Sequence, residues 1–269
     1  MAAPTEPAPL ASAVFVGTAR DCARHLPAAL ARWDDLATLF DTRALLVAEN
    51  DSVDATKEIL ARWSAGDSRR RVLTLDGLDQ THSGRAVKLA HARNRLLDAV
   101  AAEPRLRAAD YLVVMDLDEV SLDLTPARLA RCMTFAGWDA LFANQFPTYY
   151  DIWALREPRR SPDDFLAHIE RAPPGWRRLA ARLRHMNWRN RPFWPFGAPI
   201  PVTSAFGGFA IYRTGVALSA RYAGERDGRP ICEHVPFHEA MAAHGARLFL
   251  HPGLLNALPR PIARLFGRR

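Results

Sequence analysis

Two aspartates that follow an apolar run are the residues of this chain best suited to chemistry. Residues 111–115 form an unbroken apolar run that predicts a buried strand, and Asp116 and Asp118 come directly after it. Alternate residues of a strand face the same way, so both carboxylates can point at one spot. Close negative charges repel unless a cation lies between them, and Mg²⁺ and Mn²⁺ prefer oxygen ligands. The pair predicts a metal site for a phosphate-bearing substrate, with an ordinary acidic turn as the alternative.

Polar residues also follow two earlier apolar runs, residues 13–16 and residues 44–48. The first set offers backbone room, a hydroxyl and a guanidinium for phosphate, and the second offers acceptors for a base or ribose. Either set alone fits ordinary turn chemistry, but both beside the acidic pair favour a nucleotide pocket. The absence of a Gly-x-Gly-x-x-Gly or Walker sequence removes support for a nicotinamide or P-loop site. The residues are Gly17, Thr18 and Arg20 after the first run, and Glu49, Asn50 and Asp51 after the second.

One acid and three histidines lie close together in the sequence in the last part of the chain. Glu233 is a candidate general base that would take the proton from an attacking hydroxyl. His234, His238 and His251 are candidates to complete a metal shell, because neutral imidazole is a common ligand. The spacing of His234 and His238 suits one face of a helix, although Pro236 lies between them. A zinc protease would need glutamate directly after the first histidine, where a valine stands here, so that class is rejected.

The elements that must position these residues alternate along the first half of the chain. Four apolar runs predict strands, at residues 13–16, 44–48, 71–75 and 111–115. Helical periodicity lies between them, and Arg93 and Asn94 belong to the last of these helices, residues 86–100. Strands that alternate with helices predict a doubly wound, parallel sheet. Later strands are expected at residues 139–144, 207–212 and 247–250.

Composition limits the partners. The 269 residues carry a net charge of +7, with Lys57 and Lys88 as the only lysines, so arginine supplies nearly all the positive charge. This balance favours anionic partners, but no zinc-finger, basic-zipper or RNA-recognition signature is present, so we expect no nucleic-acid partner. No apolar run approaches the roughly 20 residues that span a bilayer. Three widely spaced cysteines fit a reducing compartment, so a cytoplasmic protein is expected.

Taken together, these segments resemble the GT-A glycosyltransferases, and within them the fungal capsule-associated α-mannosyltransferase group and its bacterial relatives (glycosyltransferase family 69). The resemblance extends from about residue 14 to residue 252. Its most specific part is the pairing of two acidic segments. The motifs that carry it are Glu49-Asn50-Asp51-Ser52 with Asp54 and Thr56, Ala92-Arg93-Asn94, Met115-Asp116-Leu117-Asp118-Glu119, Tyr150-Asp151-Ile152-Trp153, Phe206-Gly207-Gly208-Phe209 and Cys232-Glu233-His234.

The resemblance implies an α/β, GT-A (Rossmann-like) fold with a mostly parallel central sheet flanked by helices, plus an irregular helical and loop region on the acceptor side. It implies a nucleotide-sugar donor, Mn²⁺ or Mg²⁺ held by Asp116 and Asp118, and transfer to a hydroxyl of a glycan or lipid-linked acceptor. The particular reaction that the resemblance implies is mannosyl transfer in the synthesis of a surface polysaccharide. We take His251 as the third candidate ligand, and Glu233 and Glu119 as the catalytic candidates. The expected donor contacts are Gly17, Thr18, Arg20, Glu49, Asn50, Asp51, Arg93, Asn94 and Asp116.

The predicted organisation is one GT-A domain in two halves. Residues 12–130 form the nucleotide-sugar-binding half, and residues 131–258 form the acceptor and catalytic half. The second half contains a Trp/Arg-rich insertion at residues 154–200. Between Arg156 and Arg191 this insertion has ten arginines and only four acidic residues. Residues 1–11 are expected to be a flexible leader, and residues 259–269 a basic tail.

Two other functions are compatible with the sequence. A haloacid-dehalogenase-like phosphatase also uses Asp-x-Asp at a strand end, but it needs a later lysine and none follows Lys88. A basic module that binds a membrane or a polyanion is the non-enzymatic alternative, with tryptophans inserted and arginines on lipid phosphates. An enzyme with a lipid-linked acceptor would use such a surface as well. Peripheral association with the inner, anionic face of a membrane is therefore compatible with a glycosyltransferase.

Overall fold

The computed structural model describes residues 10–257. The predicted basic tail, residues 259–269, lies outside them. So does the predicted leader, residues 1–11, except for its last two residues, which begin the first strand, β1 (Leu10–Ala19).

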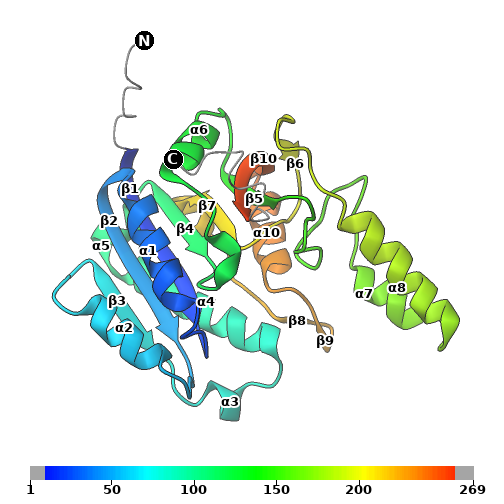
Figure 1. The fold of residues 1–269 in the computed structure, drawn as a ribbon, viewed down its shortest axis with the longest axis horizontal. Helices are drawn as coiled ribbons and strands as arrows, with labels where there is room; N and C mark the ends of the chain where they lie inside the picture. Colours follow the sequence, from blue (N-terminus) through cyan, green and yellow to red (C-terminus); the bar gives the residue numbers. More distant parts are fainter. Residues whose placement is uncertain (1–9, 258–269) are drawn as a thin grey trace.

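One eight-stranded sheet forms the centre of the molecule, in the order β3-β2-β1-β4-β7-β5-β10-β6 (Figure 1). A separate two-stranded ribbon joins β8 (Glu225–Arg226) to β9 (Arg229–Pro230). The remaining strands are β2 (Phe40–Glu49), β3 (Arg70–Thr74), β4 (Tyr111–Met115), β5 (Ala140–Gln145), β6 (Ile200–Pro201), β7 (Phe209–Arg213) and β10 (Leu248–Ala257).

The helices follow the strands in the alternation that the sequence predicts. Those that flank the sheet include α1 (Leu26–Ala37) and α4 (Arg85–Ala102), which lie on opposite faces (Figure 1). The others are α2 (Thr56–Ser64), α3 (Leu78–Thr81), α5 (Pro104–Arg107), α6 (Pro126–Met133), α7 (Phe165–Arg171), α8 (Trp176–Arg189), α9 (Thr214–Leu218), α10 (His234–Ala243) and the 3₁₀ turn η1 (Glu119–Ser121).

Strand direction confirms the α/β class and the mostly parallel sheet. β3, β2, β1 and β4 are mutually parallel, and β10 is parallel to β5. β7 runs antiparallel between β4 and β5, and β6 runs antiparallel beside β10. Since β7 opposes β4, its first residue, Phe209, lies opposite the last residue of β4, Met115. The turn at Gly207 and Gly208 is therefore brought to the edge of the sheet where β4 ends.

Apolar residues cover both faces of the sheet, which explains why the strands read as continuous apolar runs. Alternate residues face opposite sides, so Phe15 and Val113 pack with α1 and α6, while Val14 and Leu112 pack with α4 and α10. The sheet runs through both predicted halves of the domain, whose boundary at residue 130 remains a prediction.

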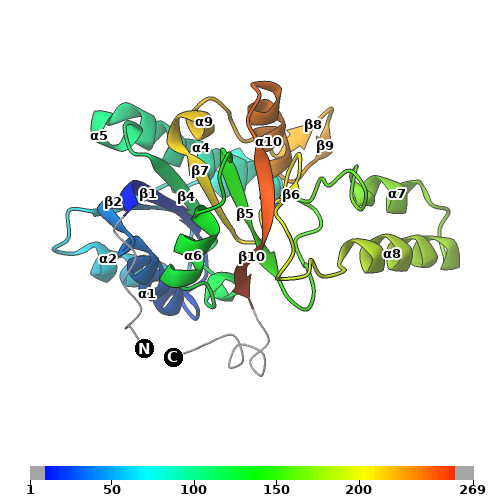
Figure 2. The same cartoon turned by 90° about the horizontal axis from the view of Figure 1, so that it is seen from above.

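The Trp/Arg-rich insertion is more regular than expected. It contains α7 and α8, which pack on each other and extend away from the sheet as a helical pair (Figure 2). Within residues 10–257, no helix is both long enough and apolar enough to cross a membrane.

Candidate active site

The candidate site lies at the edge of the sheet where β1, β2 and β4 end. Ala19 pairs with Glu49, and Val16 pairs with Val114, so the polar residues after these strands are neighbours in space. This confirms that the predicted strand ends meet. Close packing at this edge requires a glycine at position 17, because a Cβ on Gly17 would lie 2.8 Å from the carbonyl oxygen of Met115.

Arg93 is the centre of the site. This arginine of α4 is buried, and its Nη2 donates to Oδ1 of Asp116 at 3.1 Å. Its Nη1 lies 2.9 Å from Oε1 of Glu233 and also contacts Nε2 of His234. Burial disfavours the charge of Arg93, but the two carboxylates outweigh it and raise the pKa of the guanidinium above its ordinary value. One cation therefore joins the acidic segment after β4 to the start of α10.

Pro236 does not prevent the helix that this arrangement needs. α10 begins at His234, so Pro236 falls in its first turn, where backbone N–H groups have no partner within the helix. His234 and His238 then lie on one face with stacked rings 5.4 Å apart, as their spacing predicts.

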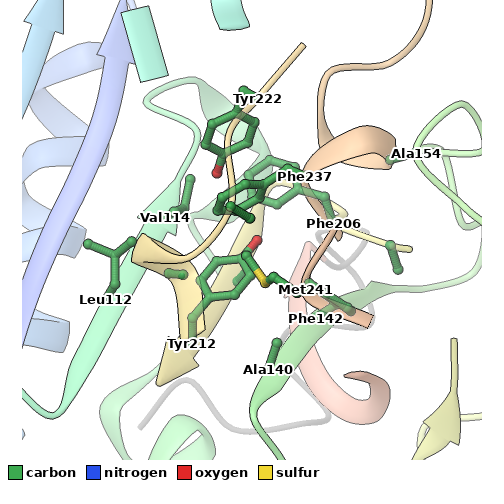
Figure 3. Packing of buried hydrophobic residues seen from close by; sticks show 14 of the residues in the cluster. Leu112, Val114, Ala140, Phe142, Ala154, Phe206, Tyr212, Tyr222, Phe237 and Met241 are labelled. Carbon is green, nitrogen blue, oxygen red and sulfur yellow. The ribbon is translucent and has the colours of Figure 1, made fainter. Parts of the chain in front are cut away.

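Aromatic rings enclose the Arg93 guanidinium. It lies over the rings of Phe206 at 5.1 Å and Tyr222 at 5.7 Å, and His234 stacks on Phe206 at 3.9 Å. Phe206 and Tyr222 belong to the packed cluster above β4 and β7 (Figure 3). Asn94 fixes Tyr222, because its amide donates to the Tyr222 carbonyl and accepts from the Tyr222 N–H, both at 2.9 Å. In this structure the polar atoms of Asn94 therefore bind backbone.

Several acids surround Asp116. Burial raises the pKa of Asp116 to about 7, and Asp118, Asp151 and Glu233 add to the effect while Arg93 opposes it. Burial raises the pKa of Asp151 as well, although its carboxylate accepts a hydrogen bond from the Gly207 N–H at 2.9 Å. Four carboxylates thus interact around one arginine, an excess of negative charge that disfavours ionisation of Asp116.

Asp118 differs from the prediction in its geometry. β4 ends at Met115, so the alternation of a strand does not extend to Asp118. Asp118 is exposed, and its Oδ1 accepts from the Val120 N–H at 3.0 Å at the start of η1. The pair is close enough for Asp118 to raise the pKa of Asp116, yet the two carboxylates have different surroundings.

Side chains of the segment after β2 accept hydrogen bonds from the backbone of the loop after β1. Three successive backbone N–H groups, those of Asp21, Cys22 and Ala23, donate to the side chains of Ser52, Thr56 and Asp54 at 3.1, 2.9 and 3.0 Å. Glu49 is buried and accepts from the Ser52 N–H at 2.9 Å. The motif therefore shapes the loop that would face a nucleotide.

Arg20 and Asp51 also have protein partners. The guanidinium of Arg20 forms a two-pronged ion pair with Asp79, which Lys88 contacts as well. Asp51 accepts from the backbone N–H groups of Gly77 at 2.6 Å and Asp79 at 3.1 Å, and the Gly77 bond is the largest cause of its lowered pKa. Asn50 is buried beside them, and Thr18 with Gly17 lines a narrow cavity that reaches Arg93. Nucleotide contacts by these residues remain predictions.

The structure places the candidate histidines in different surroundings. His238 cannot ligate a metal, because Ser204 occupies its Nδ1 at 2.9 Å and Tyr212 its Nε2 at 2.8 Å. Burial lowers the pKa of His238 to about 3, so it is a neutral core histidine. His251 contacts Phe135, and its Nδ1 accepts from the Gly253 N–H.

No three His, Cys, Asp or Glu side chains among the described residues are grouped to hold a metal ion by themselves. The structure thus does not bring His251 to Asp116 and Asp118, and its role as a ligand remains a prediction. The side chain of Glu119 lies outside the described ones, so its catalytic role also remains a prediction.

The residue-by-residue predictions missed three contributors to this site: Asp151, Phe206 and Tyr222. Asp151 and Phe206 each lie in a motif that carried the resemblance, so a signal for them was present. Tyr222 had no signal, because it reaches Arg93 only through the fold.

Comparisons with known proteins find similar solved structures only at low sequence identity. No protein-family model and no curated protein matches the chain. A mannosyltransferase from Pyrobaculum calidifontis, solved with GDP-Man and Mn²⁺, aligns over 94% of this chain with 13% identity and a TM-score of 0.48. The chain spans 59% of the length of that mannosyltransferase. A glucosyl-3-phosphoglycerate synthase from Mycobacterium tuberculosis, solved with Mn²⁺, UDP and phosphoglyceric acid, aligns over 95% of this chain and 73% of its own, with 14% identity and a TM-score of 0.45.

Proposed function

We propose that this protein is a metal-dependent GT-A glycosyltransferase that moves a hexose from a nucleotide-sugar donor to a hydroxyl of a glycan or lipid-linked acceptor. The observation that carries the proposal is the set of carboxylates at the end of β4, where Asp118, Asp151 and Glu233 all act electrostatically on Asp116 and Arg93 is the buried cation that pairs with Asp116 and Glu233. An acidic excess at the carboxyl end of parallel strands suits a divalent cation with a diphosphate.

Asp116 and Asp118 would hold Mn²⁺ or Mg²⁺. Since no third side chain of the described residues completes a cluster, the remaining ligands would come from the substrate and water, as is usual for Mg²⁺. When bound, such an ion neutralises the charge that develops on a leaving diphosphate. Arg93 would add a fixed positive charge at the same place, because its aromatic neighbours and Glu233 hold it in position.

The position of Glu233 favours a role in holding Arg93. Its side chain is buried and lies 2.9 Å from the guanidinium, so in this state it is paired and not open to an acceptor hydroxyl. We keep Glu233 as the candidate base for an inverting reaction, in which it would have to leave Arg93. Mannosyl transfer in the synthesis of a surface polysaccharide is the particular reaction that the motifs suggest, with GDP-mannose as the first donor to test.

The phosphatase alternative is not favoured. Both lysines pair with acids other than Asp116, since Lys57 pairs with Asp76 and Lys88 with Asp79. Neither is placed beside a nucleophile.

Thermal shift with nucleotide sugars tests the proposal. UDP, GDP and their glucose and mannose conjugates should raise the melting temperature only when Mn²⁺ or Mg²⁺ is present, because a ligand that binds the folded state stabilises it by mass action. Asp118→Asn should abolish the metal-dependent shift while the unliganded melting temperature changes little, because Asp118 is exposed. Asp123→Asn is the matched control in the same segment. An equal shift with and without chelator would contradict the metal role, and no shift with any nucleotide would contradict the proposal.

A further inference from the structure

One side of α8 is an apolar stripe that faces away from the protein. Trp176, Leu179 and Leu183 are three and four residues apart, so they lie along one side of the helix. Their exposed fractions are 74%, 58% and 53%. Single exposed apolar residues are common on proteins, but an aligned set on one helix indicates a surface that something covers.

The other side of α8 anchors the helix to the protein. His185 stacks on His168 of α7 with 4.7 Å between ring centroids, and Met186 packs against the hydrophobic core. Arg189 is buried, where it bonds the hydroxyl of Ser161 and the carboxylate of Asp163. These contacts fix the orientation of α8 and leave the stripe exposed to solvent. The helical pair itself extends away from the sheet (Figure 2).

Arginines border the stripe. α8 contains five arginines and no acid. At 100° per residue, Arg177 and Arg184 lie on one flank of the stripe and Arg182 on the other, and all three are exposed. Arg177 also lies over the ring of Trp176 at 5.5 Å. An apolar stripe with cationic flanks and a tryptophan is the pattern of a helix that lies in the plane of a membrane surface.

We propose that α8 docks this protein on an anionic lipid bilayer, with Trp176, Leu179 and Leu183 inserted among the acyl chains and the flanking arginines on lipid phosphates. Charge complementarity selects this partner, because the exposed cations of α8 have no acid beside them on the helix and anionic headgroups would supply the opposite charge. The proposal goes beyond the transfer reaction and does not depend on it.

Vesicle flotation tests the docking surface. The full chain should float with vesicles of equal parts phosphatidylcholine and phosphatidylglycerol at low salt, and not with phosphatidylcholine alone. Leu179→Ser with Leu183→Ser should lower the bound fraction about fivefold or more by removing buried apolar area, and Arg182→Glu with Arg184→Glu should do the same by reversing charge. Arg62→Glu with Arg105→Glu, which changes two exposed arginines of α2 and α5, is the matched control and should float like the unmodified protein.

Three results would overturn the proposal. Absence of flotation at low salt would show that the stripe does not bind lipid. Flotation that survives the leucine changes but vanishes with salt or with added nucleic acid would indicate a general polyanion surface. Concentration-dependent dimers in sedimentation that the leucine changes abolish would show that a second copy of the chain covers the stripe. Unchanged melting temperatures of all variants would show that the altered side chains are not needed for folding.

Discussion

Arg93 and Asp116 form the central relationship of the site, with Nη2 of the arginine 3.1 Å from Oδ1 of the aspartate. The same guanidinium is 2.9 Å from Glu233, so one buried cation links residues that are far apart in sequence. A buried ion pair is weak evidence for net stability, but loss of one partner leaves an uncompensated buried charge. Arg93 is therefore needed by the fold and by the charge balance of the site.

Replacement of Arg93 by methionine should destabilise the protein by about 3–5 kcal/mol, because the acids it pairs with would be left without their cation. Arg93→Lys should fold better but lose most activity, since a lysine has one ammonium nitrogen in place of the two guanidinium nitrogens that reach Asp116 and Glu233 separately. Urea unfolding and nucleotide-sugar turnover measure the two effects. Arg95→Met, which changes an exposed arginine of the same helix, should alter neither by much. A stable, active Arg93→Met variant would contradict this assignment.

Metal affinity should depend on pH near neutrality. Asp116 has a pKa of about 7 without metal, and a carboxylate must lose its proton to bind Mn²⁺. The apparent affinity should therefore fall up to about tenfold per pH unit below that value and level off above it. Calorimetric titration of Mn²⁺ between mildly acidic and mildly basic pH checks this. An affinity that does not change over this range would show that Asp116 does not titrate with metal binding.

The metal-free protein should lose stability as the pH rises. The folded state holds the Asp116 proton more tightly than the unfolded chain, whose ordinary pKa is 3.8. This contribution is fully present below that ordinary value and is lost as the pH rises through about 7. Asp116→Asn removes the titrating proton and leaves Arg93 paired with Glu233, so at basic pH it should stabilise the metal-free protein by roughly 1 kcal/mol or more. A less stable Asp116→Asn variant at basic pH would mean that its pairing with Arg93 outweighs burial.

The loop after β1 should depend on the side chains that bind it. Thr56→Val removes the acceptor for the Cys22 N–H and should cost about 1–2 kcal/mol. Nucleotide affinity should fall further, because the loop that faces the ligand would no longer be fixed. Thr38→Val, at an exposed helix end, is the control. Thermal melting and nucleotide titration distinguish the two effects, and unchanged affinity in Thr56→Val would show that the loop does not shape the donor site.

Gly17 should tolerate no side chain. A Cβ would lie 2.6 Å from the Trp33 ring and 2.8 Å from the Met115 carbonyl, so Gly17→Ala should destabilise by about 1–3 kcal/mol. Gly215→Ala in α9 meets nothing within 4 Å and should be neutral or stabilising by up to about 1 kcal/mol. Chemical denaturation of both variants checks the contrast. Equal stability of the two would contradict the close packing at Gly17.

Local pattern was enough to predict much of the fold. Residues 111–115 form β4 as expected, and the strands before it form the parallel part of the sheet with polar residues at one edge. Both signals are local, since burial on two faces gives an apolar run and strand ends require turn residues. The regular helix α8 was not predicted, because the interpretation of the insertion relied on its arginine and tryptophan content, although Trp176, Leu179 and Leu183 have helical spacing.

The α/β class, the acidic segment after β4 and the meeting of the first strand ends follow from local sequence patterns. The contacts that those residues make depend on how the chain folds. The fold places Arg93 between Asp116 and Glu233, encloses His238 between Ser204 and Tyr212, and leaves His251 beside Phe135. The physical reason is that these contacts join residues of high sequence separation, whose meeting depends on strand order and helix packing, neither of which a local pattern encodes.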